Sequence, residues 1–238
     1  MVRSLAVPSH VAFIVDGNGR WAVKQGKSRS DGHAAGANVT VDIVKKSFEM
    51  GVQYVTLYLF STENWKRPNE EIYNIFSLLE SNVRKFNGYL TENDIALKVI
   101  GQTYRLPVAV RTVLQTAQDR RPGKVPQRTL CLALSYGGRD DIVEACRNIV
   151  RDKVAMSAID EELFAGYTST GQLGIPDPDL IIRTSEFRLS NFLLYQAAYA
   201  EFASVDCPWP EFNVAVLDEI LSSFSSRTRR FGGFPPSP

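Results

Sequence analysis

The sequence predicts a single α/β domain with a mainly parallel central sheet flanked by helices. Short apolar segments rich in β-branched residues alternate along the chain with longer segments whose apolar residues recur at helical spacing. No linker and no internal repeat interrupts this alternation, and 238 residues suffice for one domain with a substantial core. We therefore expect one domain over residues 1–233, followed by a disordered Pro-rich tail at 234–238.

Five segments predict the strands of this sheet. Residues 11–15 form a short apolar run, and residues 52–60 are apolar on both faces, as a parallel strand buried between two neighbours should be. The three later strands are predicted at 95–100, 129–135 and 180–182. Because parallel strands end at the same edge of a sheet, polar residues that follow them should gather there.

Helices are predicted in the segments between and after these strands. Apolar residues recur every three to four positions in each segment, and Gly51 follows the first at a place suited to a helix end. A further helix is expected to open at Arg20 and Trp21, directly after the first strand. The other predicted helices are 38–50, 69–86, 107–120, 140–153, 189–201 and 214–230.

The composition excludes several classes of protein. A net charge of +1 gives no electrostatic case for nucleic-acid binding, and two histidines cannot supply a His-rich zinc site. Cys131, Cys146 and Cys207 are odd in number and lack Cys-x-x-Cys spacing, which favours reduced thiols. No apolar run approaches the roughly 20 residues needed to cross a bilayer, and no signal peptide is evident. We expect a cytoplasmic protein with no nucleic-acid partner and no transmembrane segment.

An anion site is predicted after the first strand, where Asp16-Gly-Asn-Gly leads into Arg20. A carboxylate there can hold a cation, while backbone N–H groups and Arg20 can meet phosphate oxygens. Lys24, Lys27, Arg29 and His33 follow within thirteen residues and strengthen this interpretation. The alternative is a tight Asx-type turn that binds nothing.

Two further polar clusters follow later strands. Four polar side chains within Ser61–Arg67 come directly after the second strand, and a helix cap would account for only one of them. Arg183 and Arg188, with hydroxyls between and after them, follow the fifth strand; two guanidinium groups can hold a diphosphate bidentately. Isolated surface arginines are the alternative for this second cluster.

Asp140 and Asp141 have the spacing of an aspartate-rich metal motif. They also fall in the first turn of a predicted helix, where acids complement the helix dipole and cap free N–H groups. We therefore expect a helix start and no metal at these two residues.

Motifs along the chain together resemble those of the cis-prenyltransferases, the undecaprenyl diphosphate synthase family. The blocks are His10-Val-Ala-Phe-Ile-Val-Asp-Gly-Asn-Gly-Arg-Trp-Ala, Gly32-His-Ala-Ala-Gly, Leu57-Tyr-Leu-Phe-Ser-Thr-Glu-Asn-Trp-Lys-Arg-Pro, Ser135-Tyr-Gly-Gly-Arg-Asp, Asp177-Pro-Asp-Leu-Ile-Ile-Arg-Thr-Ser, Arg188-Leu-Ser-Asn-Phe and Arg227-Thr-Arg-Arg-Phe-Gly-Gly. The resemblance covers roughly residues 8–233, and several colinear motifs make it highly specific.

The resemblance implies a Mg²⁺-dependent prenyltransferase that couples isoprenoid diphosphates with loss of diphosphate, working as a homodimer. Asp16 would hold the metal, with Glu201 as a second contact that belongs to the partner subunit's side of the site or is reached across the dimer. Asp16, Ser61 and Asn64 are the implied catalytic residues, with Ser61 and Asn64 handling the proton. The implied substrate-binding residues are Gly17, Asn18, Gly19, Arg20, Trp21, Arg29, His33, Glu63, Trp65, Arg67, Arg183, Arg188, Ser190 and Gly232.

Two departures from the family pattern bear on the product. Leu59 stands where long-chain relatives typically have Ala, and Phe48, Tyr73 and Phe76 add bulk, so a short product of about two or three isoprene units is expected by family analogy. The loop after Arg183 also lacks the Gly of Arg-Thr-Ser-Gly-Glu and is one residue shorter.

This shorter loop favours a branched, lavandulyl-type coupling of dimethylallyl or geranyl diphosphate. The alternatives are regular cis-1′-4 condensation with isopentenyl diphosphate, giving a short or medium linear product, and a non-catalytic partner subunit of a prenyltransferase.

Overall fold

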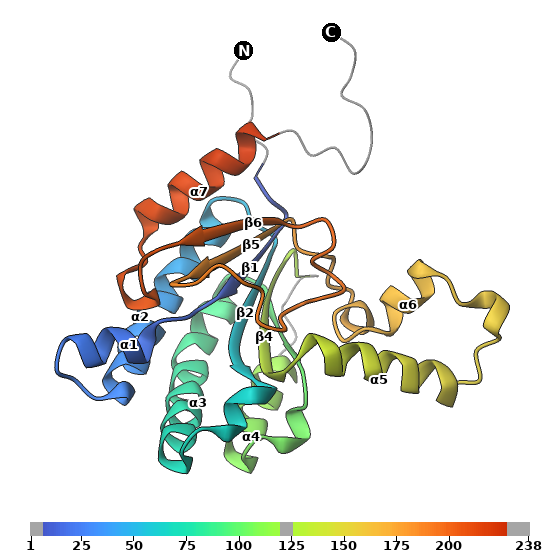
Figure 1. Ribbon diagram of the computed structural model, residues 1–238, viewed down its shortest axis with the longest axis horizontal. Helices are drawn as coiled ribbons and strands as arrows, with labels where there is room; N and C mark the ends of the chain where they lie inside the picture. The colour runs from blue at the N-terminus through green and yellow to red at the C-terminus, as the bar shows by residue number, and fades with distance from the viewer. Residues whose placement is uncertain (1–6, 120–125, 228–238) are drawn as a thin grey trace, which may run out of the picture.

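The computed structural model describes residues 7–119 and 126–227, which form one six-stranded sheet covered by helices (Figure 1). The strand order is β3-β4-β2-β1-β5-β6, and each neighbouring pair is parallel. The strands are β1 His10–Ile14, β2 Tyr54–Ser61, β3 Ile95–Ile100, β4 Arg128–Tyr136, β5 Leu180–Thr184 and β6 Glu201–Val205. The predicted α/β domain with a parallel central sheet is confirmed.

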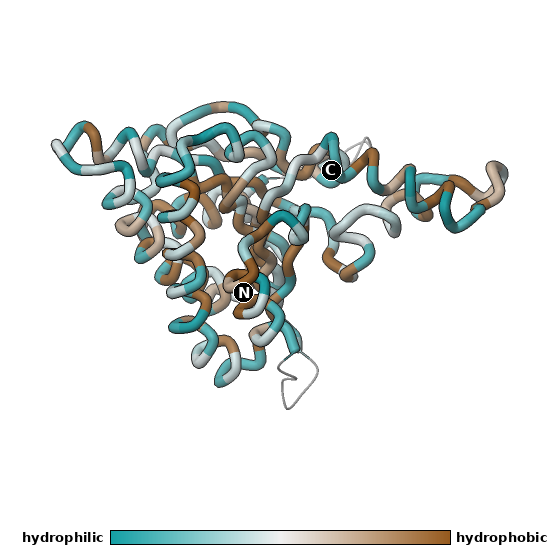
Figure 2. Tube along the Cα trace, turned by 90° about the horizontal axis from the view of Figure 1, so that it is seen from below, coloured by the Kyte–Doolittle hydropathy of each residue, from teal (hydrophilic) through white to brown (hydrophobic). Residues whose placement is uncertain are grey.

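The helices cover the two faces of the sheet unequally. The α-helices are α1 Asn18–Lys24, α2 Arg29–Glu49, α3 Asn69–Glu92, α4 Val108–Asp119, α5 Gly138–Arg151, α6 Glu161–Tyr167 and α7 Val214–Ser226. The larger core joins one face of the sheet to α2, α3, α4 and α7. Hydrophilic and hydrophobic positions alternate along these helices, as expected for helices with one buried face (Figure 2). In Figure 1, α5 and α6 extend away from the rest of the molecule. Within the described ranges, none of the helices has the length and apolar character that crossing a membrane requires.

One predicted helix, on the second face of the sheet, is wrong. Residues 189–201 do not form a helix: they make a series of turns, and Glu201 begins strand β6. Ser190, Asn191 and Leu193 have φ values of 49°, 64° and 44°, which a right-handed helix cannot contain. The apolar spacing arises because Phe192 and Leu193 are fully buried in the core of this second face.

Other differences concern the ends of elements. Helix α2 begins at Arg29, because Ser28 and Asp31 form a capping box there, and α3 continues to Glu92. Strand β6 and the short helix α6 carried no clear pattern in the sequence. The tail at 234–238, predicted to be disordered, lies outside the described residues.

The acidic pair Asp140–Asp141 lies in the first turn of α5, as predicted. Asp141 is buried, and its carboxylate accepts hydrogen bonds from the Tyr136 hydroxyl (2.9 Å), the Ser169 amide (2.8 Å) and Gln196 (3.1 Å). These three hydrogen bonds satisfy the buried carboxylate of Asp141, so its burial requires no metal ion.

Candidate active site

The register of the sheet brings three predicted clusters to one edge. Ile14 pairs with Tyr58 of β2 and with Arg183 of β5, so the residues that follow these strands emerge side by side. They surround the mouth of a cavity of about 740 Å³. Its polar lining at the mouth is Asp16, Asn18, Arg20, Arg29, His33, Ser61, Glu63, Asn64, Arg67, Glu71, Arg183, Arg188, Ser190 and Asn191.

Asp16 lies at the centre of this mouth. Its Oδ1 accepts from the Gly17 amide at 2.6 Å and pairs with Arg20 at 3.2 Å, while its Oδ2 accepts from Arg183 at 2.9 Å. Burial opposes ionisation, but the Gly17 amide, Arg183 and Arg20 outweigh it and hold the pKa of this carboxyl below its usual value. Asp16 is therefore negatively charged at neutral pH and partly open to solvent.

Arg183 is the most buried charged group of the mouth, with its side chain only 3% exposed. Its Nη2 donates to Asp16 and, at 3.2 Å, to Glu186, while its Nη1 donates to the Ser190 hydroxyl at 2.6 Å and to the Arg188 carbonyl. Both Nη atoms are thus engaged by protein groups. Of the arginines near it, Arg20 and Arg188 keep exposed side chains, at 51% and 66%.

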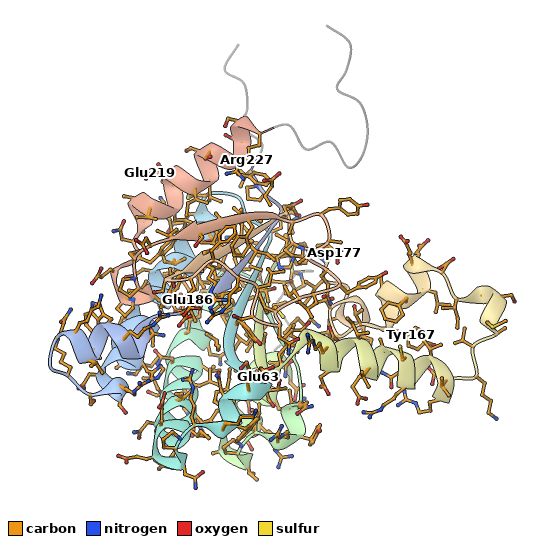
Figure 3. All side chains as sticks on the ribbon, viewed as in Figure 1. Glu63, Tyr167, Asp177, Glu186, Glu219 and Arg227 are labelled. Atoms are coloured by element: carbon orange, nitrogen blue, oxygen red, sulfur yellow. The ribbon has the colours of Figure 1, made fainter. Side chains whose placement is uncertain are left out.

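Glu186 is a site residue that sequence reasoning missed. Its Oε1 pairs with Arg20 at 3.0 Å, and its Oε2 pairs with Arg183 at 3.2 Å and with Arg188 (Figure 3). One carboxylate therefore joins guanidinium groups from α1, β5 and the loop after β5. The acid placed between two arginines in Arg183-Thr-Ser-Glu-Phe-Arg188 is the sequence feature that could have indicated it.

A second missed acid, Glu71, organises the other side of the mouth. Its Oε1 accepts at 3.0 Å from Arg67, four residues earlier and just before α3, and lies 3.3 Å from His33 Nε2. Burial lowers the pKa of His33, although the Glu71 contact opposes the shift. The predicted residues His33 and Arg67 thus share one anchoring carboxylate.

The glycines of the first two motifs allow close packing. A Cβ at Gly32 would lie 2.1 Å from the Asn18 carbonyl oxygen, and one at Gly36 would lie 2.1 Å from Asn18 Oδ1. Gly17 has φ +98°, and a Cβ there would lie 2.4 Å from the Ser185 hydroxyl. These positions let α1, α2 and the loop after β5 meet around Asn18, whose buried Oδ1 has no hydrogen-bond partner.

The cluster after β2 combines lining and packing residues. The Ser61 amide donates to Asn64 Oδ1 at 3.0 Å, which caps the 3₁₀ helix η1 (Thr62–Lys66). Glu63 accepts from Asn191 at 2.9 Å and so ties this cluster to the loop after β5. Trp65 is not among the lining residues: its indole donates to Ser135 at 2.8 Å and packs on Phe60 and Phe76.

Two other predicted residues, Trp21 and Glu201, are not at the mouth of the cavity. Trp21 does not line the cavity, and Lys27 Nζ lies 5.2 Å from the centre of its ring. Glu201 pairs with Leu180 at the amino end of β5 and contacts Arg227 at 2.7 Å, so within one chain it lies at the opposite end of the strands from Asp16. In Figure 3, Arg227 lies far from Glu186 at the mouth. Gly232 lies outside the described residues.

The interior of the cavity is deep and mainly apolar. Its polar exception on α3 is Asn82, whose side-chain amide donates to the Leu78 carbonyl at 2.8 Å. Besides Leu59 and Phe76 near the mouth, the interior is lined by residues of β3, β4 and the far half of α3: Leu79, Val83, Phe86, Leu90, Leu97, Leu130 and Leu132. From Glu71 to Leu90, α3 spans about 28 Å, since a helix rises roughly 1.5 Å per residue. Phe48 and Tyr73, expected to narrow this space, do not line it: Phe48 is in the core and Tyr73 faces solvent.

Known proteins of one family are similar to this chain in sequence. The sequence profile of the undecaprenyl diphosphate synthase family matches residues 14–232. This chain belongs to that family. An isoprenyl transferase of Brucella abortus is 44% identical over 237 residues (96% of this chain, 91% of the relative), and one of Chlorobaculum tepidum is 45% identical over 235 residues (96% and 87%). The resemblance inferred from the motifs is confirmed, and the chain is a prenyltransferase.

A solved structure extends the likeness to the fold. Lavandulyl diphosphate synthase from Lavandula x intermedia, determined in complex with dimethylallyl diphosphate, superimposes with a TM-score of 0.88 at 32% identity and covers 95% of this chain and 98% of its own. The chain is thus a prenyl diphosphate synthase of the cis-prenyltransferase type, and the cavity at the carboxyl ends of its strands is the candidate active site.

Proposed function

We propose that this enzyme couples an allylic diphosphate with isopentenyl diphosphate at the cavity mouth and holds the growing hydrocarbon in the apolar interior. The observation that carries the proposal is that one cavity combines a charged mouth with a deep, mainly apolar interior. The allylic C–O bond breaks with loss of diphosphate, the alkene of the acceptor forms the new C–C bond, and one proton is then lost. Cations at the mouth stabilise the negative charge that collects on the departing diphosphate.

A divalent metal ion, used by this family, fits Asp16. Mg²⁺ prefers oxygen ligands and commonly binds one or two carboxylates together with water and substrate phosphate oxygens. Asp16 supplies an ionised carboxylate that is partly exposed at the mouth of the cavity. When bound, Mg²⁺ would neutralise charge on the diphosphate.

A homodimer would be needed for Glu201 to reach the same ion. Glu201 and Asp16 lie at opposite ends of the strands of one chain, so a shared contact requires Glu201 of a second copy. The homodimer, with Glu201 of one copy at the metal site of the other, is a proposal based on the family resemblance.

Within the chain, the proposed roles follow the geometry. Arg20, Arg29 and His33, with the Gly19 amide, hold the allylic diphosphate, while Arg188 and Ser190 hold the acceptor. The Gly17 amide is engaged by Asp16, so Gly17 contributes the close approach of the backbone. Arg183 positions Asp16 and Ser190. Ser61 and Asn64, which line the mouth after β2, are the proposed groups for moving the proton.

The depth of the cavity favours a linear product of medium length. An extended isoprene unit adds four C–C bonds, or roughly 5 Å, so a path along α3 accommodates about five units. Leu59 and Phe76 line the upper part of this path and do not close it. We therefore favour the medium linear product over the two or three units expected from the sequence.

A branched product is the second candidate. The loop between Arg183 and Arg188 is shorter than the family pattern, and the fold is similar to that of a lavandulyl diphosphate synthase. A shift of about 1 Å in the acceptor can redirect coupling when reacting atoms must align.

Product analysis separates these possibilities. The purified chain with Mg²⁺ is given dimethylallyl diphosphate alone, and then geranyl and isopentenyl diphosphates together. Linear cis products that require isopentenyl diphosphate support the first proposal, and a branched diphosphate from dimethylallyl diphosphate alone supports the second. Absence of turnover under all conditions would contradict both and indicate a non-catalytic partner subunit.

A further inference from the structure

We propose that the Glu186 carboxylate competes with the substrate diphosphate for the guanidinium groups of Arg20 and Arg188 and thereby weakens diphosphate binding. The inference rests on the proposed function, because it concerns the affinity of the same mouth for its substrate. Glu186 would then set how readily a diphosphate enters and leaves.

The contacts of Glu186 resemble those that a phosphate group makes. Each of its two oxygens meets at least one guanidinium, at 3.0 Å for Arg20 and 3.2 Å for Arg183, and Arg188 completes the set. A carboxylate and a phosphate oxygen pair use the same guanidinium donors in the same plane. A diphosphate that uses these donors therefore has to displace Glu186 from them.

The three arginines differ in their freedom to change partner. Arg183 is buried and also donates to Asp16, Ser190 and the Arg188 carbonyl, so it stays in place. Arg20 and Arg188 are more than half exposed, and each pairs with carboxylates at the surface of the mouth. Exchange of an exposed ion pair costs little, so these two arginines can move from Glu186 to a diphosphate.

The backbone around Glu186 is held independently of its side chain. The Glu186 amide donates to the Thr184 carbonyl at 2.9 Å, and the Glu186 carbonyl accepts from the Ser204 hydroxyl at 3.1 Å. The preceding Ser185, at φ +68°, packs against Gly17. A change of the side chain alone should therefore leave the loop where it is.

The test measures binding of inorganic pyrophosphate to the full chain by titration calorimetry, without metal and without turnover. Glu186→Gln keeps the shape of the side chain and removes its charge. We expect pyrophosphate to bind about tenfold more tightly, the size expected when a few partly exposed ion pairs no longer compete. The matched control is Glu63→Gln, which removes the same charge from the same mouth at a residue that hydrogen-bonds to Asn191 and Thr62.

Unchanged or weaker binding in Glu186→Gln would overturn the proposal, since Glu186 would then hold the arginines in a binding conformation. Equal tightening in Glu63→Gln would also overturn it, because the effect would be one of general charge. Should Glu186→Gln lower the melting temperature sharply, Glu186→Asp carries the test: its shorter side chain withdraws from the arginines, and tighter binding is again expected.

The result is independent of whether coupling occurs. A chain that binds pyrophosphate more tightly as Glu186→Gln but shows no prenyl coupling would refute the proposed function alone. A chain that couples prenyl diphosphates but shows no tightening would refute the role of Glu186 alone.

Discussion

Arg183 Nη2 donates to Asp16 Oδ2 across 2.9 Å and so joins the ends of β5 and β1 at the centre of the cavity mouth. Asp16 comes 167 residues before Arg183 in the chain. The pair keeps Asp16 ionised and gives the buried guanidinium an anionic partner. Proposed metal binding and the stability of the sheet edge therefore depend on the same contact.

Replacing Asp16 should separate its chemical role from its structural one. We expect Asp16→Ala to lower turnover by at least about a hundredfold, because the anchor for the metal at the departing diphosphate is lost. Loss of one partner of Arg183 should lower the free energy of unfolding by about 1–3 kcal/mol, since Glu186 remains. Pyrophosphate release and chemical denaturation measure the two effects. Asp16→Asn, which keeps the size of the side chain, serves as the control, and normal turnover of Asp16→Ala with Mg²⁺ would refute the assignment.

Arg183 at the end of β5 and Arg188 in the loop after it should respond differently to the same substitution. Arg183→Lys loses the two-pronged donation to Asp16 and Ser190, so we expect the free energy of unfolding to fall by about 2–4 kcal/mol. Arg188→Lys, at an exposed position, should change it by less than about 0.5 kcal/mol while still lowering activity. Denaturant unfolding of both variants measures the difference. Equal stability of the two would mean that Arg183 does not position the site.

The length of the product should depend on residues deep in the cavity. Val83→Phe places a ring midway along α3 in space that is open in the structure, and we expect shorter products. Tyr73→Ala, on the exposed face of the same helix, is the matched control and should leave the products unchanged. Chromatography of the dephosphorylated products gives the length. Longer products from Leu59→Ala with Phe76→Ala would show instead that these two residues form the floor, as the sequence suggested.

Stability should fall in mildly acidic solution because of His10. Its ring is fully buried, with Nε2 2.8 Å from Thr56 and Nδ1 2.7 Å from the Pro176 carbonyl, and burial lowers its pKa to about 4 although Asp179 opposes the shift. The unfolded chain takes up a proton below about pH 6.5 and the folded chain only near pH 4. The neutral ring thus contributes its full stabilisation above pH 6.5. On the order of 3 kcal/mol of the free energy of unfolding is lost as the pH falls to 4.

Denaturant unfolding between pH 7 and 4 measures this loss. His10→Gln should show a shallower slope, with a remainder from His33, whose pKa is also lowered. Carboxyl groups with a lowered pKa, such as that of Asp16, change the free energy of unfolding only below about pH 4. Their effect therefore falls in a different pH range from that of His10. An unchanged slope in His10→Gln would refute the role of His10.

The fold class and the positions of most helices and strands can be predicted from the sequence alone. Short continuous apolar runs such as Leu130–Leu134 are typical of strands buried on both faces, and their alternation with amphipathic segments predicts a parallel sheet. Parallel strands end at one edge, so Asp16, Ser61 and Arg183 could be placed together before any coordinates were known. The motifs also sufficed to recognise the family.

The contacts that each of these side chains makes depend on the tertiary structure. Phe192 and Leu193 are buried, and a segment of turns can bury such residues at the same sequence spacing as a helix. The spacing of apolar residues therefore indicates which residues are buried but does not determine the backbone conformation. The partners of Arg183, Glu186 and Glu71 and the place of Glu201 depend on contacts between distant segments. Such contacts produce no local sequence pattern, because they result from the packing of the whole sheet against its helices. The depth of the cavity between α3 and the sheet results from the same packing.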